Sequence, residues 1–309
     1  MTTARPLAGD FARVYDPSDG QPDRWYINDH TLIRDHLGTW HLVGITHREP
    51  LAPFDELDLA HATAPSLQGP WTRQPYALSA DQESHETHLW APHIVFHDET
   101  YWMFYCAGGS SKSEYRIHLA TSADCASWKR HVDNPMVIDG FEARDPMVLR
   151  LRDRWVMYYT ATSEPEGGNH IVAAAQSDDL TRWSGRRVVY RDPMTGTMAG
   201  PTESPFVCER GGTYYLLIGP DYEGLVRSKR ETGRYDRAAY RRTRVIASDD
   251  PLSFDLADQV ATIDAHAAEV VRDETGGWWV SHCGWGQGGV YLAPLTWTTE
   301  ADSVDGDDR

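Results

Sequence analysis

The segment WAPHIVFHDETYWMFYCAG at residues 90–108 decides the fold, because two apolar runs in it are separated by the polar turn HDET. Both runs are short and rich in Val, Ile, Phe, Tyr and Trp, a composition typical of β-strands. A polar turn between two such runs predicts an antiparallel hairpin. The segment RIHLATSADCASW at residues 116–128 adds a third strand of small and apolar residues and ends on a Trp.

The same pattern recurs five times along the chain with a period of roughly 60 residues. In the fourth copy, GLVRSKRETGRYD at residues 224–236 stands in the place of the third strand. Sustained helical periodicity is absent, and the closest candidate, ETGRYDRAAYR at residues 231–241, reads equally well as a turn. The aromatic residues that close the five copies are Trp71, Trp128, Trp183, Tyr235 and Trp297.

Five units that cannot bury their faces alone predict an all-β fold, a five-bladed β-propeller with four-stranded antiparallel blades around a central channel. A β-sandwich is the alternative, but it does not explain why the closing aromatic residue returns in register. We expect a single domain over residues 1–299, with FARVYDP at residues 11–17 closing the last blade. The acidic residues 300–309 are expected to form a disordered tail.

Composition narrows the choice of partners. The formal charge is −17, from 29 Lys and Arg against 46 Asp and Glu, and no basic stripe is present, which argues against nucleic acid. No leader pattern and no apolar run of about 20 residues occurs, so we expect a cytoplasmic protein without a membrane span. The oligomeric state is not predicted. The cysteines are too far apart for a zinc site or a disulfide scaffold and are expected to be free thiols: Cys106, Cys125, Cys208 and Cys283.

The innermost strand of each blade runs along the axis of a propeller, so the residues at its start converge on one mouth of the channel. Nearly all residues at these places are charged, amide or imidazole groups. They are, blade by blade, Asn28 and Asp29, Trp90 and His93, Arg144 and Asp145, Thr202 and Glu203, and His266 and Glu269.

Three of these residues are carboxylates: Asp29, Asp145 and Glu203. One carboxylate before a strand is ordinarily a turn residue, but three at equivalent points of three repeats predict a functional cluster. Cleavage of a glycosidic bond needs a proton for the leaving oxygen and a carboxylate on the opposite face of the anomeric carbon. A third carboxylate helps to keep the acid protonated by repulsion between like charges. The pattern therefore predicts a glycosidase with a carbohydrate substrate.

At these positions the sequence resembles the five-bladed propeller glycoside hydrolases, which include families 43 and 62 (arabinofuranosidases, xylosidases, arabinanases) and families 32 and 68 (fructosidases). The resemblance covers nearly the whole chain. It is carried by IND at 27–29, WAPHIVFHDETYWMFY at 90–105, RDP at 144–146, ESP at 203–205 and HAAEVV at 266–271.

The resemblance implies a furanoside substrate, such as a fructoside or an arabinofuranoside, and possible transglycosylation by the same machinery. It implies Asp29 as nucleophile or base, Asp145 as stabiliser of the transition state and Glu203 as general acid. The chain departs from the fructosidase pattern NDPNG, since His30 follows Asp29 here. It also ends soon after the fifth repeat, without the further β-sandwich of many family 32 enzymes, which favours a small furanosidase-like enzyme.

Retention of configuration requires the Asp29 and Glu203 carboxyl groups to lie about 5 to 5.5 Å apart, and inversion requires about 6.5 to 9.5 Å. The RDP motif at residues 144–146 favours retention, whereas the WAP segment at residues 90–92 counts against it. The sequence leaves both outcomes open.

Six further residues are candidates for substrate binding: Asn28, Trp90, His93, Arg144, His266 and Glu269. Arg144 suits either a substrate group or a structural ion pair, and Trp90 suits either a sugar platform or packing between blades. His85, His88 and His93 invite a metal site, but histidines that line a pocket are commoner, so no metal ligands are assigned and no cofactor is required. The resemblance nevertheless allows a calcium ion in the channel near His266.

Two other functions stay open. A glycoside phosphorylase on the same fold would need a cationic phosphate site, for which only Arg144 and the histidines near Trp90 are available. A propeller that binds sugars without catalysis would keep the aromatic residues but would not need all three carboxylates.

Overall fold

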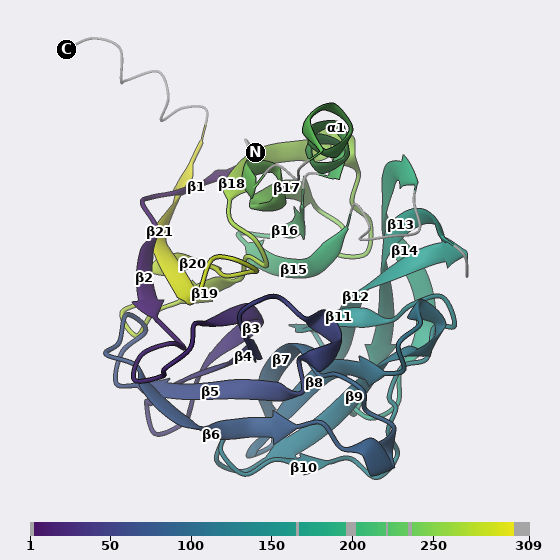
Figure 1. Cartoon of the computed structure of the whole chain (residues 1–309). Helices are drawn as coiled ribbons and strands as arrows, with labels where there is room; N and C mark the ends of the chain where they lie inside the picture. The colour runs from purple at the N-terminus through teal and green to yellow at the C-terminus, as the bar shows by residue number, and fades with distance from the viewer. Residues whose placement is uncertain (1–2, 165–166, 196–201, 221, 234–236, 300–309) are drawn as a thin grey trace, which may run out of the picture.

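The computed structural model describes residues 3–164, 167–195, 202–220, 222–233 and 237–299. Its strands form five antiparallel sheets, which stand around a common axis as the blades of a propeller (Figure 1). The sequence prediction of an all-β, five-bladed propeller is therefore confirmed. No helix in these residues is both long enough and apolar enough to cross a membrane.

In blades one to four, strands that follow one another in the chain pair side by side, so each of these blades is a meander. Blade one contains β3 (Trp25–Arg34), β4 (Trp40–Arg48), β5 (Asp58–Ala64) and β6 (Thr72–Ser79). Blade two contains β7 (Trp90–His97), β8 (Thr100–Gly108), β9 (Tyr115–Ser122) and β10 (Lys129–Arg130). Blade three contains β11 (Arg144–Leu151), β12 (Arg154–Glu164), β13 (Gly167–Ser177) and β14 (Ser184–Thr195).

Blade four contains β15 (Glu203–Arg210), β16 (Thr213–Gly219), β17 (Arg242–Ser248) and β18 (Gln259–Asp264). Blade five contains β19 (Val270–Arg272), β20 (Trp278–His282) and β21 (Val290–Thr298). The two N-terminal strands β1 (Arg5–Ala8) and β2 (Ala12–Tyr15) both pair with β21. The predicted closure of the last blade by the N-terminal stretch is thus confirmed, and it joins the two ends of the propeller. The short 3₁₀ helices are η1 (Pro53–Asp55), η2 (Gln82–Ser84), η3 (Lys112–Glu114) and η4 (Leu256–Asp258).

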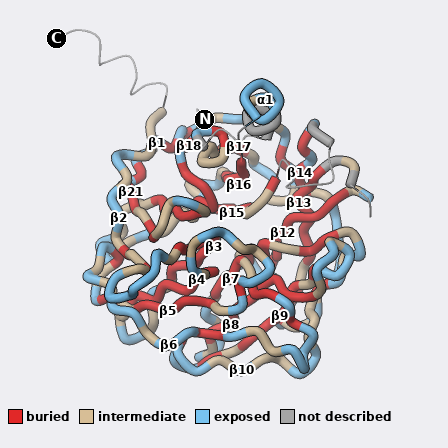
Figure 2. Tube along the Cα trace, viewed as in Figure 1, coloured by how far each residue is buried: buried red, intermediate tan, exposed pale blue. Residues whose placement is uncertain are grey.

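The core lies between neighbouring blades, because each blade buries both of its faces. Along β12, Met157 and Tyr159 pack toward blade two, whereas Val156 and Tyr158 pack toward blade four. Alternate side chains of a strand point to opposite faces, so a strand with two buried faces must be apolar at every position. This explains the adjacent aromatic residues in the sequence pattern. Figure 2 shows the same division, with buried inner strands and exposed turns at the outer rim.

The closing aromatic residue belongs to a recurring turn after the third strand. Trp128 donates its indole N–H to the carbonyl of Cys125 at 3.1 Å, and Trp183 donates in the same way to Leu180 at 3.2 Å. In blade four the equivalent turn follows β17 and ends in Phe254, which is buried in the interface with blade three. Tyr235, predicted for this role, lies outside the described residues. Trp297 lies within β21 and is not part of such a turn.

Blade four differs from the prediction in one further respect. The segment expected to supply its third strand is mainly the helix α1 (Tyr222–Thr232), and a second short helix, α2 (Arg237–Tyr240), follows it. Both belong to an insertion between β16 and β17, and the third strand is β17 itself. The helical candidate ETGRYDRAAYR overlaps both helices. The tail at residues 300–309 lies outside the described residues, and the four cysteines are free and buried, as expected.

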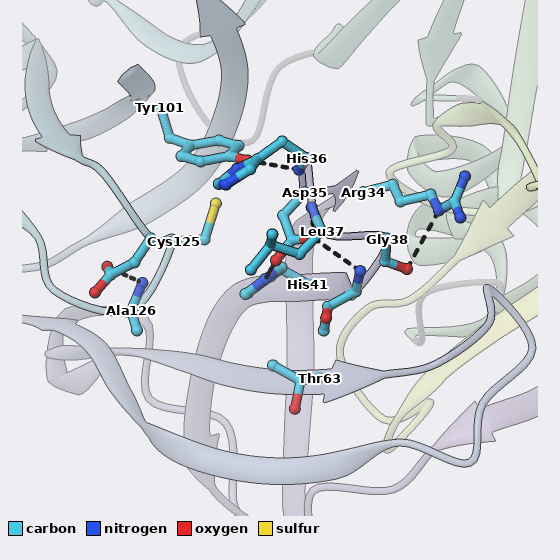
Figure 3. A network of polar contacts seen from close by, with 12 residues as sticks. Arg34, Asp35, His36, Leu37, Gly38, His41, Thr63, Tyr101, Cys125 and Ala126 are labelled. Carbon is cyan, nitrogen blue, oxygen red and sulfur yellow. Dashed lines mark hydrogen bonds and ion pairs between the residues drawn. The ribbon is translucent and has the colours of Figure 1, made fainter. Parts of the chain in front are cut away.

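The turn between β3 and β4 shows how local polar contacts connect blades one and two (Figure 3). One oxygen of Asp35 accepts hydrogen bonds from the backbone N–H groups of Leu37 and Thr39, at 2.9 and 2.8 Å. The next residue, His36, donates its backbone N–H to the Tyr101 hydroxyl of blade two at 3.0 Å. The turn is thereby closed by its own aspartate and fixed to the neighbouring blade.

A buried carboxylate, Glu86, holds the loop that enters blade two. It accepts hydrogen bonds from the Tyr105 hydroxyl at 2.8 Å and from the Arg130 guanidinium, whose Nε lies 3.0 Å away. Burial alone would raise the pKa of Glu86, but the neighbouring His118 and Arg130 outweigh burial and lower the pKa to about 2. Glu86 is therefore ionised at neutral pH and its charge is balanced in place.

We expect Glu86→Gln to lower the free energy of unfolding by about 3 kcal/mol at pH 7, because it leaves Arg130 partly buried without its counter-charge. The folded pKa of Glu86 is depressed, so its contribution is complete above the pKa of the unfolded chain and is lost as the pH falls toward 2. Urea denaturation should show that the deficit shrinks as the pH falls below about 4.5. Glu83→Gln, in the same loop but exposed, is the control. A deficit that grew with acidity would contradict this role.

Candidate active site

The start of each innermost strand has the same unusual backbone. At this start, every blade has a residue other than glycine with a positive φ. The five residues are Asp29 (24°), Ala91 (45°), Asp145 (54°), Ser204 (50°) and Ala267 (46°). In β3, β7, β11 and β15 the pairing register also shifts by one residue at this point. In these four blades the feature is a β-bulge, which changes the direction of the side chains that follow.

Blade one needs a glycine opposite its bulge. A Cβ atom at Gly44 of β4 would lie 2.9 Å from the side chains of both Ile27 and His30 and 3.2 Å from the carbonyl oxygen of Asp29. Such contacts are too close, so only glycine allows the bulged strand to approach here. The Gly in HLVGITH is a sequence signal for this bulge.

The bulges correct one step of the sequence argument. Asp29 and Asp145 both occupy the bulged position, but in blade four that position belongs to Ser204. Glu203 is one residue earlier, and its structural counterparts are Asn28, Trp90, Arg144 and His266. The prediction that the three carboxylates are equivalent is therefore wrong by one residue in blade four. The three carboxylates still converge on the channel despite this shift of one residue.

Arg144 brings the carboxylates of blades three and four together. Its Nη1 lies 2.6 Å from Oδ2 of Asp145 and 3.6 Å from Oε2 of Glu203, and its Nε lies 2.6 Å from Oε1 of Glu142. Its Nη2 also donates to the backbone carbonyl of Thr202 at 3.3 Å. Arg144 thus makes the ion pairs that were one alternative, and its contact with substrate stays a prediction.

Ser204 connects the carboxylate of blade one to this group. Its hydroxyl donates a hydrogen bond to Oδ1 of Asp29, and its backbone N–H donates to Oδ2 of Asp145 at 3.0 Å. The Thr160 hydroxyl donates to the same oxygen of Asp145 at 3.2 Å. Asp29, Asp145 and Glu203 thus belong to one hydrogen-bonded and ion-paired cluster.

A small cavity of about 30 Å³ lies in the channel beside this cluster, lined by Asp29, Asp145, Ser204 and Glu269, among others. This volume suits water and is too small for a sugar ring. A sugar ring must therefore bind outside this cavity.

Glu203 has the protonation behaviour of a general acid. Burial raises its pKa, the Arg144 charge lowers it, and the charges of Asp145 and Glu142 raise it again, which leaves the pKa at about 7. Its side chain is 20% exposed, enough to reach a ligand. A carboxyl group with this pKa is largely protonated in mildly acidic solution and loses its proton readily.

Asp29 is coupled to the same carboxylates. Burial and the charges of Asp145 and Glu203 raise the pKa of Asp29 well above its ordinary value. The Ser204 hydrogen bond and the Arg144 charge lower this pKa but do not outweigh the first effects. The repulsion from Glu203 disappears once Glu203 is protonated, and Asp29 then ionises more easily. Asp29 and Glu203 therefore compete for a proton, and the pKa of each lies above its ordinary value.

The other predicted binding residues surround this cluster in different ways. Asn28 is buried, and its Oδ1 has no hydrogen-bond partner within the described part of the chain. His93 and Glu269 face each other across the channel, with Nδ1 and Oε1 3.6 Å apart. His266 lies 3.8 Å from Glu203 and stacks on Tyr240 with ring centres 4.0 Å apart. Trp90 stacks on His88 at 3.8 Å, so one face of its ring is already covered.

The structure does not bring the histidines near Trp90 into a metal site. His85 is exposed, His88 packs on Trp90, and His93 lies in the channel. Across the residues with a defined position, no three His, Cys, Asp or Glu side chains are arranged to hold a metal ion. The calcium ion that the resemblance allows near His266 stays a prediction, and no chemistry is assigned to it below.

Three residues near the carboxylates were not found from the sequence. Glu142 binds both Arg144 and Lys112, whose Nζ lies 3.2 Å from it. Tyr240 comes from the insertion in blade four and covers His266. Glu142 precedes the RDP motif by two residues, which is a usable signal. Lys112 and Tyr240 lie in segments outside the repeat pattern, and nothing in the sequence connects them with the channel.

Known proteins resemble this chain in sequence. A family model described as "Glycosyl hydrolases family 43" matches residues 63–302. A probable arabinan endo-1,5-alpha-L-arabinosidase C of Aspergillus fumigatus is 37% identical over 75 residues, 23% of each protein. The protein of the same name from Aspergillus flavus is 27% identical over 166 residues, 51% of this chain and 50% of that protein. The chain thus matches about a quarter to a half of the length of these curated relatives.

Solved structures share the fold. A thermostable family-43 glycoside hydrolase superposes with a TM-score of 0.66 at 16% identity, covering 93% of this chain and 94% of that one. The endo-arabinase from Bacteroides thetaiotaomicron gives 0.64 at 15% identity, covering 93% and 97%. The Bombyx mori GH32 beta-fructofuranosidase BmSUC1 gives 0.60 at 18% identity, covering 89% and 61%. At these identities the likeness shows the common propeller and does not distinguish substrates.

The charge balance of the cluster can be tested by titration. We expect the Glu203 carboxyl carbon, assigned by ¹³C NMR from its absence in Glu203→Gln, to titrate with a pKa of about 7. Asp145→Asn should lower this pKa, because it removes a negative neighbour and frees Arg144 for Glu203. Asp153→Asn, in an exposed turn of the same blade, should leave it unchanged. An unchanged pKa in Asp145→Asn would show that the two carboxylates are not coupled.

Proposed function

The chain belongs to glycosyl hydrolases family 43, and from this membership we propose that it is a glycosidase that hydrolyses α-L-arabinofuranosidic bonds in an arabinan-type glycan. The observation that carries the reaction type is the cluster of Asp29, Asp145 and Glu203 at the channel, in which Glu203 has a pKa of about 7. The choice of sugar is supported by the names of the Aspergillus relatives.

Glu203 acts as the general acid in this proposal. Its proton goes to the glycosidic oxygen as the bond to the anomeric carbon breaks, so that the leaving group departs as an alcohol. The site is net negative, since Arg144 faces Glu142, Asp145 and Glu203. An oxocarbenium-like transition state carries positive charge and is stabilised by such a field.

Asp29 acts on the opposite face of the anomeric carbon. The cavity beside it has room for water, which favours activation of a water molecule over direct attack by the carboxylate. We therefore propose inversion of configuration, in contrast to the retention that the RDP motif favours. Asp145 touches Arg144 and the Ser204 N–H, and it keeps the pKa of Glu203 high by repulsion.

The geometry speaks against the phosphorylase alternative. Phosphate would need a free cation, but Arg144 is already bound by carboxylates and Lys112 pairs with Glu142. Burial lowers the pKa of His266 to about 3 and that of His88 to about 4, so these imidazoles are neutral at physiological pH. A sugar-binding protein without catalysis would gain nothing from burying three carboxylates together, a costly arrangement.

The acid role of Glu203 predicts a dependence on the leaving group. Glu203→Gln should reduce kcat/KM on arabino-oligosaccharides by about 10³-fold or more, but far less on an aryl arabinofuranoside, whose leaving group needs no proton. Glu209→Gln, exposed on the same strand β15, is the matched control and should be neutral. Equal losses on the two substrates would overturn the acid role.

The stereochemical outcome and the sugar can be read in one assay. Arabinofuranosides and fructosides of equal length are incubated in phosphate-free buffer, and the first-formed anomer is followed by ¹H NMR. We expect turnover of the arabinofuranoside with the inverted anomer as first product. A retained anomer would contradict inversion and assign Asp29 as nucleophile. Turnover of fructosides alone would contradict the proposed arabinofuranoside substrate. A requirement for phosphate would favour the phosphorylase alternative.

A further inference from the structure

Ser204 has a backbone conformation that suits another residue better. Its φ of 50° lies in the left-handed region, where glycine fits without strain and a residue with a Cβ costs about 1 kcal/mol. Its backbone N–H, which binds Asp145 at 3.0 Å, would be present whatever the side chain. The hydroxyl group is therefore the only part of Ser204 that offsets this cost.

That hydroxyl is bound to Asp29. The bond joins β15 of blade four to β3 of blade one, residues that are 175 positions apart in the chain. It is the one hydrogen bond that the Asp29 side chain receives from the described residues, since the guanidinium of Arg144 is directed to Glu142, Asp145 and Glu203.

The remaining groups around Asp29 do not favour its charged form. Asp145 on β11 and Glu203 on β15 repel it, and Arg144 offsets only part of this repulsion. Tyr240 from α2 and the thiol of Cys283 also lie near, and burial raises the pKa of each well above its ordinary value, so both are neutral. Without the hydroxyl, Asp29 would face two acids across a buried channel with no hydrogen bond to hold its orientation.

We propose that Ser204 is a positioning residue, whose hydroxyl orients the Asp29 carboxylate in the channel and stabilises its charged form while its backbone N–H holds Asp145. The inference rests on the proposed function, in which Asp29 must be ionised to activate water. In this role Ser204 acts through Asp29.

The decisive variant is Ser204→Gly, which removes the hydroxyl, keeps the N–H and relieves the backbone. We expect an unchanged or higher Tm together with a loss of kcat/KM of about ten- to hundredfold, as for a lost hydrogen bond to a charged group. Losing a donor to a carboxylate raises its pKa, so the acidic limb of the pH profile should move to higher pH. Ser204→Ala should show the same kinetic change without the gain in Tm, and Ser204→Cys should lie between wild type and Ala.

Arg152→Gly is the matched control, because Arg152 has a similar φ of 53° in an exposed turn of blade three. It should raise Tm without changing the pH profile. Unchanged kinetics in Ser204→Gly would overturn the positioning role. A lower Tm with an equal loss of activity at every pH would also overturn it, since it would indicate a purely structural residue.

Two measurements separate this inference from the proposed function. Asp29→Asn should abolish activity; if it does while Ser204→Gly is neutral, only the role of Ser204 fails. An active Asp29→Asn variant would instead overturn the assignment of Asp29. The ¹³C titration of the Asp29 carboxyl carbon does not require turnover, and its pKa should be higher in Ser204→Gly than in the wild type. An equal pKa in the two proteins would refute the stabilisation of the charged form.

Discussion

The left-handed residue at the start of each innermost strand is the constraint on which the site depends. Five such strands converge on the channel, and this conformation recurs at the residue that lines the cavity in every blade: Asp29, Ala91, Asp145, Ser204 and Ala267. This conformation is energetically unfavourable for residues other than glycine. Packing on both faces of each blade offsets that free energy. The scaffold is the same in each blade, and the chemistry depends on which side chains occupy it.

A shortage of positive charge then determines the protonation of the site. Arg144 is shared by Glu142, Asp145 and Glu203, so its charge cannot neutralise them all. Burial, together with the repulsion that remains, raises the pKa of Glu203 to about 7 and that of Asp29 well above its ordinary value. Hydrolysis of an acetal requires an acid and a base that share one proton. Here carboxyl groups serve for both, because their surroundings alter their pKa values.

Much of the fold could be predicted because burial on both faces leaves a strong local pattern. Strands such as β12 must be apolar at every position, so hairpins with adjacent aromatic residues mark each blade. Blade four departs from the prediction because an insertion containing α1 and α2 separates β16 from β17. An insertion at a blade edge does not disturb the core, and so the repeat pattern contains no sign of it. The same insertion supplies Tyr240, whose place over His266 had no sequence signal.

The sequence by itself determined the five repeats, the three carboxylates and their meeting at one mouth of a channel, because these follow from periodicity and from the geometry of propellers. Only the tertiary structure decided that Ser204 and not Glu203 occupies the bulge of blade four, since the bulge is a backbone conformation that residue types do not specify. The contact between Ser204 and Asp29 likewise required the folded chain. Residues on different blades are brought together by the closure of the propeller, and their order in the chain contains no record of which atoms then touch.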